Sequence, residues 1–82
     1  MRYYLGIEFK GSNIMNLVRV TRFSGGLSAA KEPSDATAFD SAEEAKDVFY
    51  RFKNSYPVEF GERVVRAAIF DANLTNIGAL SF

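Results

Sequence analysis

Hydrophobic and polar side chains alternate along the first ten residues of the chain. Between residues 3 and 9 the odd positions are Tyr, Leu, Ile and Phe, while Gly and Glu stand among the even positions. Side chains on a β-strand point to opposite faces with a period of two, so this pattern predicts a half-buried strand. Turn residues follow at 11–13, and residues 14–23 predict a second strand that completes a hairpin.

The alternation within this second segment changes parity. Met15 and Leu17 share one parity, whereas Val18 and Val20 share the other. A β-bulge near Val18 would produce such a change, and so would burial of both faces of the strand. The sequence leaves both explanations open.

Residues 39–57 carry the clearest helical signal. Asp40 or Ser41 is the expected N-cap, and Ser41 with Glu44 matches the S-x-x-E capping box. Apolar residues then recur at spacings of three and four, which predicts one buried stripe of Ala42, Ala45, Val48, Phe49 and Phe52, which Tyr56 would extend. Asp47 and Arg51 have the spacing of an ion pair within a helix. Asn54, Ser55 and Pro57 predict the end of the helix.

Residues 63–71 predict a third strand, and residues 76–82 a fourth. Val64, Ala68 and Phe70 are expected on the face of Arg66, and apolar residues of the other parity indicate that this strand is central or covered on both faces. Residues 24–38 are expected to form a long mobile loop. The chain is thus predicted to be one α+β domain over residues 1–82, with the order β-β-α-β-β and one helix packed on one face of an antiparallel sheet. A β-β-α-β core with a loose C-terminal arm is the second architecture.

Composition narrows the function classes. The chain has no Cys and no His, which removes disulfides, thiol chemistry and the commonest general base and metal ligand. Its carboxylates form no recognisable acid/base motif, so we expect neither catalysis nor a cofactor. No run of 18 apolar residues and no signal-peptide pattern is present, so we expect a cytoplasmic protein that does not enter a membrane.

Two kinds of binding remain. The first is binding of nucleic acid, because an open sheet with arginines and aromatic rings can hold a single nucleic-acid strand. Tyr4 and Phe23 are aromatic residues on predicted strands, and the arginines on these strands are Arg2, Arg19, Arg22, Arg63 and Arg66. The alternative is that these arginines are solvated beside acidic residues such as Glu8 and Asp71. The formal net charge of +0 at pH 7 does not favour nucleic acid.

Protein binding is the other kind. Residues 77–82 are mostly apolar and carry no charge, so their strand edge could pair with a second chain, in a homodimer or with another protein. Tyr50 and Arg51 on the helix belong to residue types that are enriched at interface hot spots. The alternative is that the tail packs into its own sheet.

The sequence resembles small phage-encoded accessory proteins of the anti-CRISPR type. The resemblance rests on the order of elements, on the phrase Phe39-Asp40-Ser41-Ala42-Glu43-Glu44-Ala45 and on the later strand 66–71. It implies a non-catalytic inhibitor that blocks a larger host complex by steric occlusion. The candidate contact residues are Tyr4, Arg19, Arg22, Arg63 and Arg66 on the sheet, or Tyr50 and Arg51 on the helix.

Overall fold

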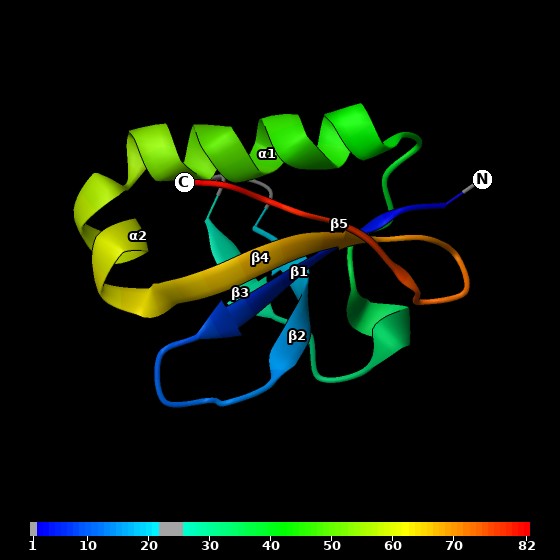
Figure 1. The fold of residues 1–82 in the computed structure, drawn as a ribbon, viewed down its shortest axis with the longest axis horizontal. Helices are drawn as coiled ribbons and strands as arrows, with labels where there is room; N and C mark the ends of the chain where they lie inside the picture. The colour runs from blue at the N-terminus through cyan, green and yellow to red at the C-terminus, as the bar shows by residue number, and fades with distance from the viewer. Residues whose placement is uncertain (1, 22–25) are drawn as a thin grey trace.

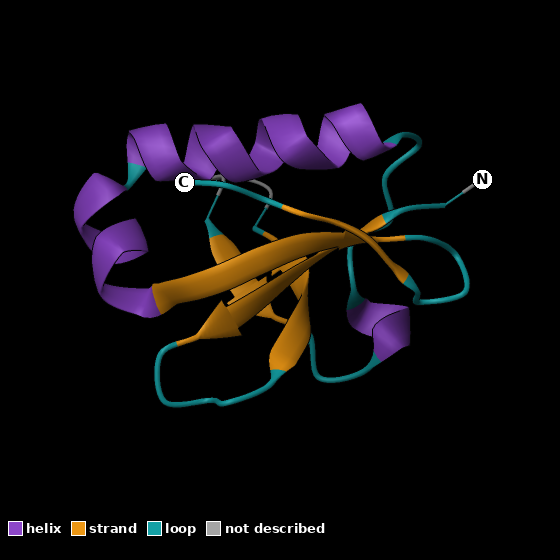
Figure 2. Ribbon diagram, viewed as in Figure 1, coloured by secondary structure: helices purple, strands orange, loops and turns teal. Residues whose placement is uncertain are grey.

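The computed structural model describes residues 2–21 and 26–82 and shows two layers, a five-stranded antiparallel sheet and a pair of helices on one of its faces (Figures 1 and 2). In chain order the elements are β1 (Tyr4–Phe9), β2 (Met15–Val20), β3 (Leu27–Ala29), η1 (Pro33–Asp35), α1 (Ala42–Ser55), α2 (Pro57–Arg63), β4 (Val64–Phe70) and β5 (Asn76–Ala79). The strand order across the sheet is β3-β2-β1-β4-β5. The predicted α+β class and the antiparallel sheet with a helix on one face are confirmed.

The expected loop over residues 24–38 contains more regular structure than its composition indicates. In the described part of that range, β3 pairs with β2 through Leu27, whose side chain is buried, and η1 begins at Pro33. Three strand residues are too few to show alternation, which is why the sequence pattern does not reveal β3. The mobility of this loop stays a prediction.

A second helix, α2, was not predicted. Pro57 was interpreted as the end of α1, and it also occupies the first turn of α2, where a missing backbone N–H costs nothing. Phe60 anchors α2, because its ring packs at centroid distances of 5.3 Å from Phe49 and 6.1 Å from Phe52. Arg63 therefore ends a helix, and its placement on the third strand was wrong.

Helix α1 begins as the capping residues predict. Ser41 Oγ accepts a hydrogen bond of 3.1 Å from the Glu44 N–H. The Glu44 carboxylate accepts one of 3.3 Å from the N–H of Asp40, one residue earlier than in a standard capping box. The expected Asp47–Arg51 ion pair is absent from the described side chains, and Lys46 lies 3.7 Å from Glu43 instead.

The parity change in β2 comes from burial on both of its faces. No register shift interrupts its pairing with β1. Val18 is fully buried on the helix side, while Met15 and Leu17 are half-buried on the opposite face.

Strand β4 contains the bulge instead. Glu8 pairs with Arg66 and Phe9 with Val64, so Val65 is an extra residue, and it is exposed. Because of the bulge, the Val64 side chain points into the core on the same side as Ala67. The prediction that Val64 lies on the face of Arg66 was therefore wrong.

The long connection from β3 to α1 changes sides of the sheet. η1 lies on the side opposite α1 (Figure 1). The chain then passes between the ends of β1 and β2. There Thr37 N–H donates to Val18 O at 3.0 Å, and Tyr3 and Phe39 exchange two backbone hydrogen bonds of 2.9 and 2.8 Å. Among the described residues, no helix has the length and apolar composition needed to cross a membrane.

Candidate binding surface

Helices α1 and α2 lie on the same side of the sheet, which leaves the opposite side to strand side chains and η1. We call this side the helix-free face. The pairing of Gly6 with Ala68 and of Glu8 with Arg66 fixes which side chains of β1 and β4 it carries. Pairing of Gly6 with Leu17 adds the odd-numbered residues of β2. From β1, β2 and β4 this face carries the side chains of Tyr4, Glu8, Met15, Leu17, Arg19, Arg66, Ala68 and Phe70.

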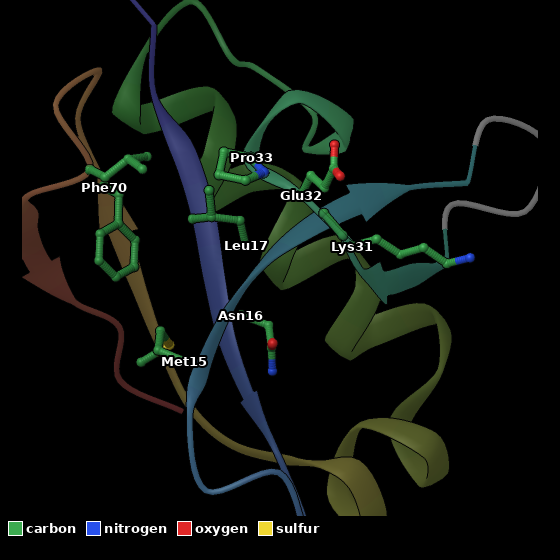
Figure 3. Close-up of a pocket in the computed structure, with 9 residues that line it drawn as sticks. Met15, Asn16, Leu17, Lys31, Glu32, Pro33 and Phe70 are labelled. Carbon is green, nitrogen blue, oxygen red and sulfur yellow. The ribbon is translucent and has the colours of Figure 1, made fainter.

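A hollow with a volume of about 300 Å³ lies on this face. Its apolar lining comes from β2, β4, the β4–β5 turn and η1: Met15, Leu17, Phe70, Leu74 and Pro33. Figure 3 shows the side chains of Met15, Leu17, Phe70 and Pro33 in front of the sheet, with α1 behind it. We call this the apolar hollow.

A second hollow, of about 420 Å³, adjoins the first through Ala30 and Lys31. Arg19, Ser28 and Asp35 contribute its polar lining. Neither Arg19 nor Lys31 forms an ion pair with a described acidic side chain. In Figure 3 the Lys31 side chain extends away from Phe70, so its ammonium group is free to meet an anionic group beside the apolar hollow.

Leu74 lies at the rim of the apolar hollow in an unfavourable backbone conformation. Its φ is 61°, in the left-handed region that glycine or asparagine usually occupies. The turn holds it there, because Asp71 Oδ1 accepts hydrogen bonds from the N–H groups of Asn73 (2.9 Å) and Thr75 (3.0 Å). Leu74 is nevertheless 43% exposed, so little burial compensates for the strain. Strained residues of this kind concentrate at functional sites.

The structure brings three of the predicted contact residues to one face: Tyr4, Arg19 and Arg66. Arg66 is already engaged, because its guanidinium forms an ion pair with Glu8 and its Nε donates to Glu8 Oε1 at 3.0 Å. The Glu8 side chain is only 12% exposed and the Arg66 side chain is 71% exposed. The expectation that strand arginines pair with acidic neighbours therefore holds for Arg66 and Glu8. Asp71, the other named acid, holds the β4–β5 turn instead.

The other predicted contact residues lie elsewhere. Arg63 pairs with Glu59 at 2.9 Å and stacks over the ring of Phe9. Tyr50 donates its hydroxyl to Ser81 O at 2.8 Å, which ties the C-terminal tail to α1. Arg51 is exposed on α1, away from the sheet. Arg22 lies outside the described residues.

The outer edge of β5 ends the sheet on one side. All four residues of β5 are exposed, and Ile77 is 48% exposed. Beyond β5 the chain returns to the helices, where the Phe82 ring lies 5.0 Å from that of Phe60 and 5.6 Å from that of Phe49. The C-terminal segment thus packs against its own domain at Phe82, while the outer edge of β5 pairs with no other described strand.

Sequence reasoning did not identify the residues of the apolar hollow. Met15 and Leu17 gave a signal, since they were apolar on the parity opposite to Val18. Leu74 gave none, because the left-handed backbone of a non-glycine residue is visible only in the structure. In the described ranges 2–21 and 26–82, no group of three or more His, Cys, Asp or Glu side chains is placed to hold a metal ion.

Comparisons with known protein families, with curated proteins and with solved structures found no match to this chain. The role of the helix-free face therefore has to follow from its own side chains.

Proposed function

We propose that the chain is a non-catalytic protein-binding module that contacts its partner through the helix-free face. The apolar hollow carries this proposal. A two-layer α+β domain normally solvates the free face of its sheet with polar side chains, whereas this face presents Met15, Leu17, Phe70 and Leu74 around a cavity. Methionine adapts its shape to a protein partner, and aromatic side chains are enriched at the core of protein interfaces.

The backbone of Leu74 supports the same proposal. Glycine at this position would remove the cost of a left-handed backbone, and yet the residue is an exposed leucine that lines the hollow. A side chain that costs stability without being buried in its own domain is accounted for by burial in a complex.

We propose further that binding acts by steric occlusion. The chain spans principal-axis extents of 32 × 27 × 23 Å, so it can cover a functional surface of a larger complex without carrying out a reaction. The resemblance to anti-CRISPR proteins extends this proposal to a phage inhibitor of a bacterial defence complex, acting in the host cytoplasm.

The test is affinity capture from bacterial lysate with three tagged baits: the natural chain, a double variant Leu17→Glu and Leu74→Glu on the helix-free face, and Arg51→Glu on the exposed side of α1. The proposal expects one set of proteins to bind the natural chain and Arg51→Glu but not the double variant. Thermal unfolding of each bait controls for loss of structure. Capture that Arg51→Glu abolishes and the double variant retains would contradict the assignment of the face.

A nucleic-acid-binding role is the second candidate, because Tyr4, Arg19 and Arg66 do share one face. The Glu8–Arg66 pair weakens it, since the carboxylate neutralises one of the arginines. Titration of labelled single- and double-stranded oligonucleotides at low salt separates the two roles, because phosphate contacts are strongest there. Oligonucleotide binding that Arg19→Glu abolishes would favour this second role.

A further inference from the structure

We infer that the free edge of β5 pairs with β5 of a second copy of this chain, so that two sheets join into one continuous sheet. This inference does not depend on the proposed function, because it concerns the edge of the sheet and not its helix-free face. It rests on the hydrogen-bonding groups of β5, on the residues that surround it and on the absence of charge along it.

The backbone of β5 presents outward groups on both sides of a break in its pairing with β4. The Leu80 N–H donates to Ala67 O at 2.9 Å, which directs this amide toward β4. The pairing of Ile69 with Gly78 and of Phe70 with Asn76 skips Ile77, so the alternation is interrupted there. On the two sides of this break, the N–H and C=O of Asn76 and Ala79 point away from β4. Unpaired groups of this kind are a template for another strand.

Exposed apolar side chains gather around the same strand. The exposed large hydrophobic residues of the described chain are Ile14, Val58, Val65, Leu74, Ile77 and Phe82. Three of them, Leu74, Ile77 and Phe82, lie on β5 or in the segments next to it. A partner strand along β5 would cover part of this apolar surface.

The lack of charge favours a second copy as the occupant. Residues 72–82 contain no charged side chain and no proline, and these are two of the features that keep strand edges from pairing. A two-fold axis places each residue of the edge opposite the same segment of the other copy. Two charged edges of the same sign would repel each other in this arrangement, whereas two uncharged β5 edges do not. The opposite edge of the sheet is less suited to pairing with a second copy, because β3 has only three residues and the charged residues Lys31 and Glu32 follow it.

The geometry of such a dimer has a consequence for the helix-free face. Antiparallel pairing of two β5 strands in one sheet requires a two-fold axis perpendicular to the sheet, which keeps both helix layers on the same side. The helix-free faces of the two copies then form one continuous surface with two apolar hollows.

Sedimentation equilibrium over a range of protein concentrations tests the inference. The natural chain should associate reversibly as a dimer. Ile77→Lys adds a charge to the edge, and Ala79→Pro removes an outward donor, so each should raise the dimer dissociation constant roughly tenfold or more. Ala29→Lys places the same charge on the β3 edge and should leave the constant unchanged. Circular dichroism shows whether each variant keeps its fold.

Cysteine cross-linking provides a second measurement, because the natural chain has no Cys and therefore no background. A β-carbon added at Gly78 meets nothing within 4 Å, so Gly78→Cys is tolerated by the fold. Oxidation should yield a covalent dimer of Gly78→Cys and none of Ser28→Cys on β3.

A natural chain that remains monomeric at every concentration would overturn the inference, as would a dimer that Ile77→Lys and Ala79→Pro leave intact. Partner capture is read separately, so a monomer that still captures its partner refutes only the dimer.

Discussion

The ring of Phe70 lies over the backbone of Gly6 on the helix-free face. A β-carbon at Gly6 would lie 3.0 Å from Phe70 Cδ2, closer still to Cε2, and 3.1 Å from Met15 Cγ. Glycine at this position is therefore what allows Phe70 and Met15 to lie flat against β1. The shape of the apolar hollow depends on this contact, because both side chains line it.

Gly6→Ala should consequently lower the free energy of unfolding by about 1–3 kcal/mol, since the Phe70 ring has to move. Gly78→Ala is the matched control on β5, where the added methyl group meets nothing within 4 Å. It should raise the free energy of unfolding by about 0.5 kcal/mol by restricting the unfolded chain. Urea unfolding of both variants at low concentration measures the difference. Equal stabilities would contradict the packing described for Phe70.

Leu74→Gly should separate stability from binding. It relieves the left-handed leucine and should raise the free energy of unfolding by about 0.5–1 kcal/mol, while weakening the capture of a protein partner. Asn13→Gly is the control, because Asn13 has a nearly identical φ of 62° but lies in the β1–β2 turn, outside the apolar hollow. It should leave partner capture unchanged. Thermal unfolding and quantitative capture measure the two effects, and unchanged capture with Leu74→Gly would count against a contact role for Leu74.

The Glu8–Arg66 pair should respond unequally to the loss of either partner. Arg66→Ala leaves the nearly buried Glu8 carboxylate without its guanidinium and should cost about 1–3 kcal/mol. Glu8→Gln should cost less, because the exposed Arg66 guanidinium remains hydrated and the glutamine oxygen can still accept its hydrogen bond. Urea unfolding at neutral pH compares the two. A larger loss for Glu8→Gln would mean that the pair is not the source of the stability.

Tyr50 was predicted as a contact residue, but its hydroxyl holds the backbone of Ser81. Tyr50→Phe should therefore lower the free energy of unfolding by about 0.5–1.5 kcal/mol, the usual value of one hydrogen bond, and should leave partner capture intact. Amide hydrogen exchange of residues 80–82 should become faster, because the tail loses an attachment to α1. Loss of partner capture with an unchanged tail would restore Tyr50 as a contact residue.

How far the sequence predicts this structure depends on the length of each element. Helix α1 is fully predictable, because Ser41, the apolar stripe and Pro57 mark its start, its buried side and its end within the same short stretch. β3 and α2 were not predicted, since three residues cannot show a period and Pro57 was interpreted only as a stop. Val64 was assigned to the wrong face because the bulge at Val65 is set by the pairing of β4 with β1, which the sequence of β4 alone does not reveal.

The contact surface was predictable only in part. Tyr4, Arg19 and Arg66 were named as contact candidates from their residue types, but their common face follows only from the pairing of β1 with β2 and β4. Strand parity did not reveal the apolar hollow, which combines Leu17 from β2, Phe70 from β4 and Pro33 from the connection to α1. Residues so far apart in the sequence meet through the strand order and through the passage of the β3–α1 connection across the helix-free face.

Amide hydrogen exchange of the chain, free and bound to the protein that it captures, tests the central claim most directly. If the helix-free face is the contact surface, residues 15–19 on β2 and residues 70–74, from the end of β4 into the β4–β5 turn, should exchange more slowly in the complex. The exposed side of α1 around Arg51 should exchange at the same rate in both states. Protection confined to α1, with no change in β2 or in the β4–β5 turn, would contradict the claim.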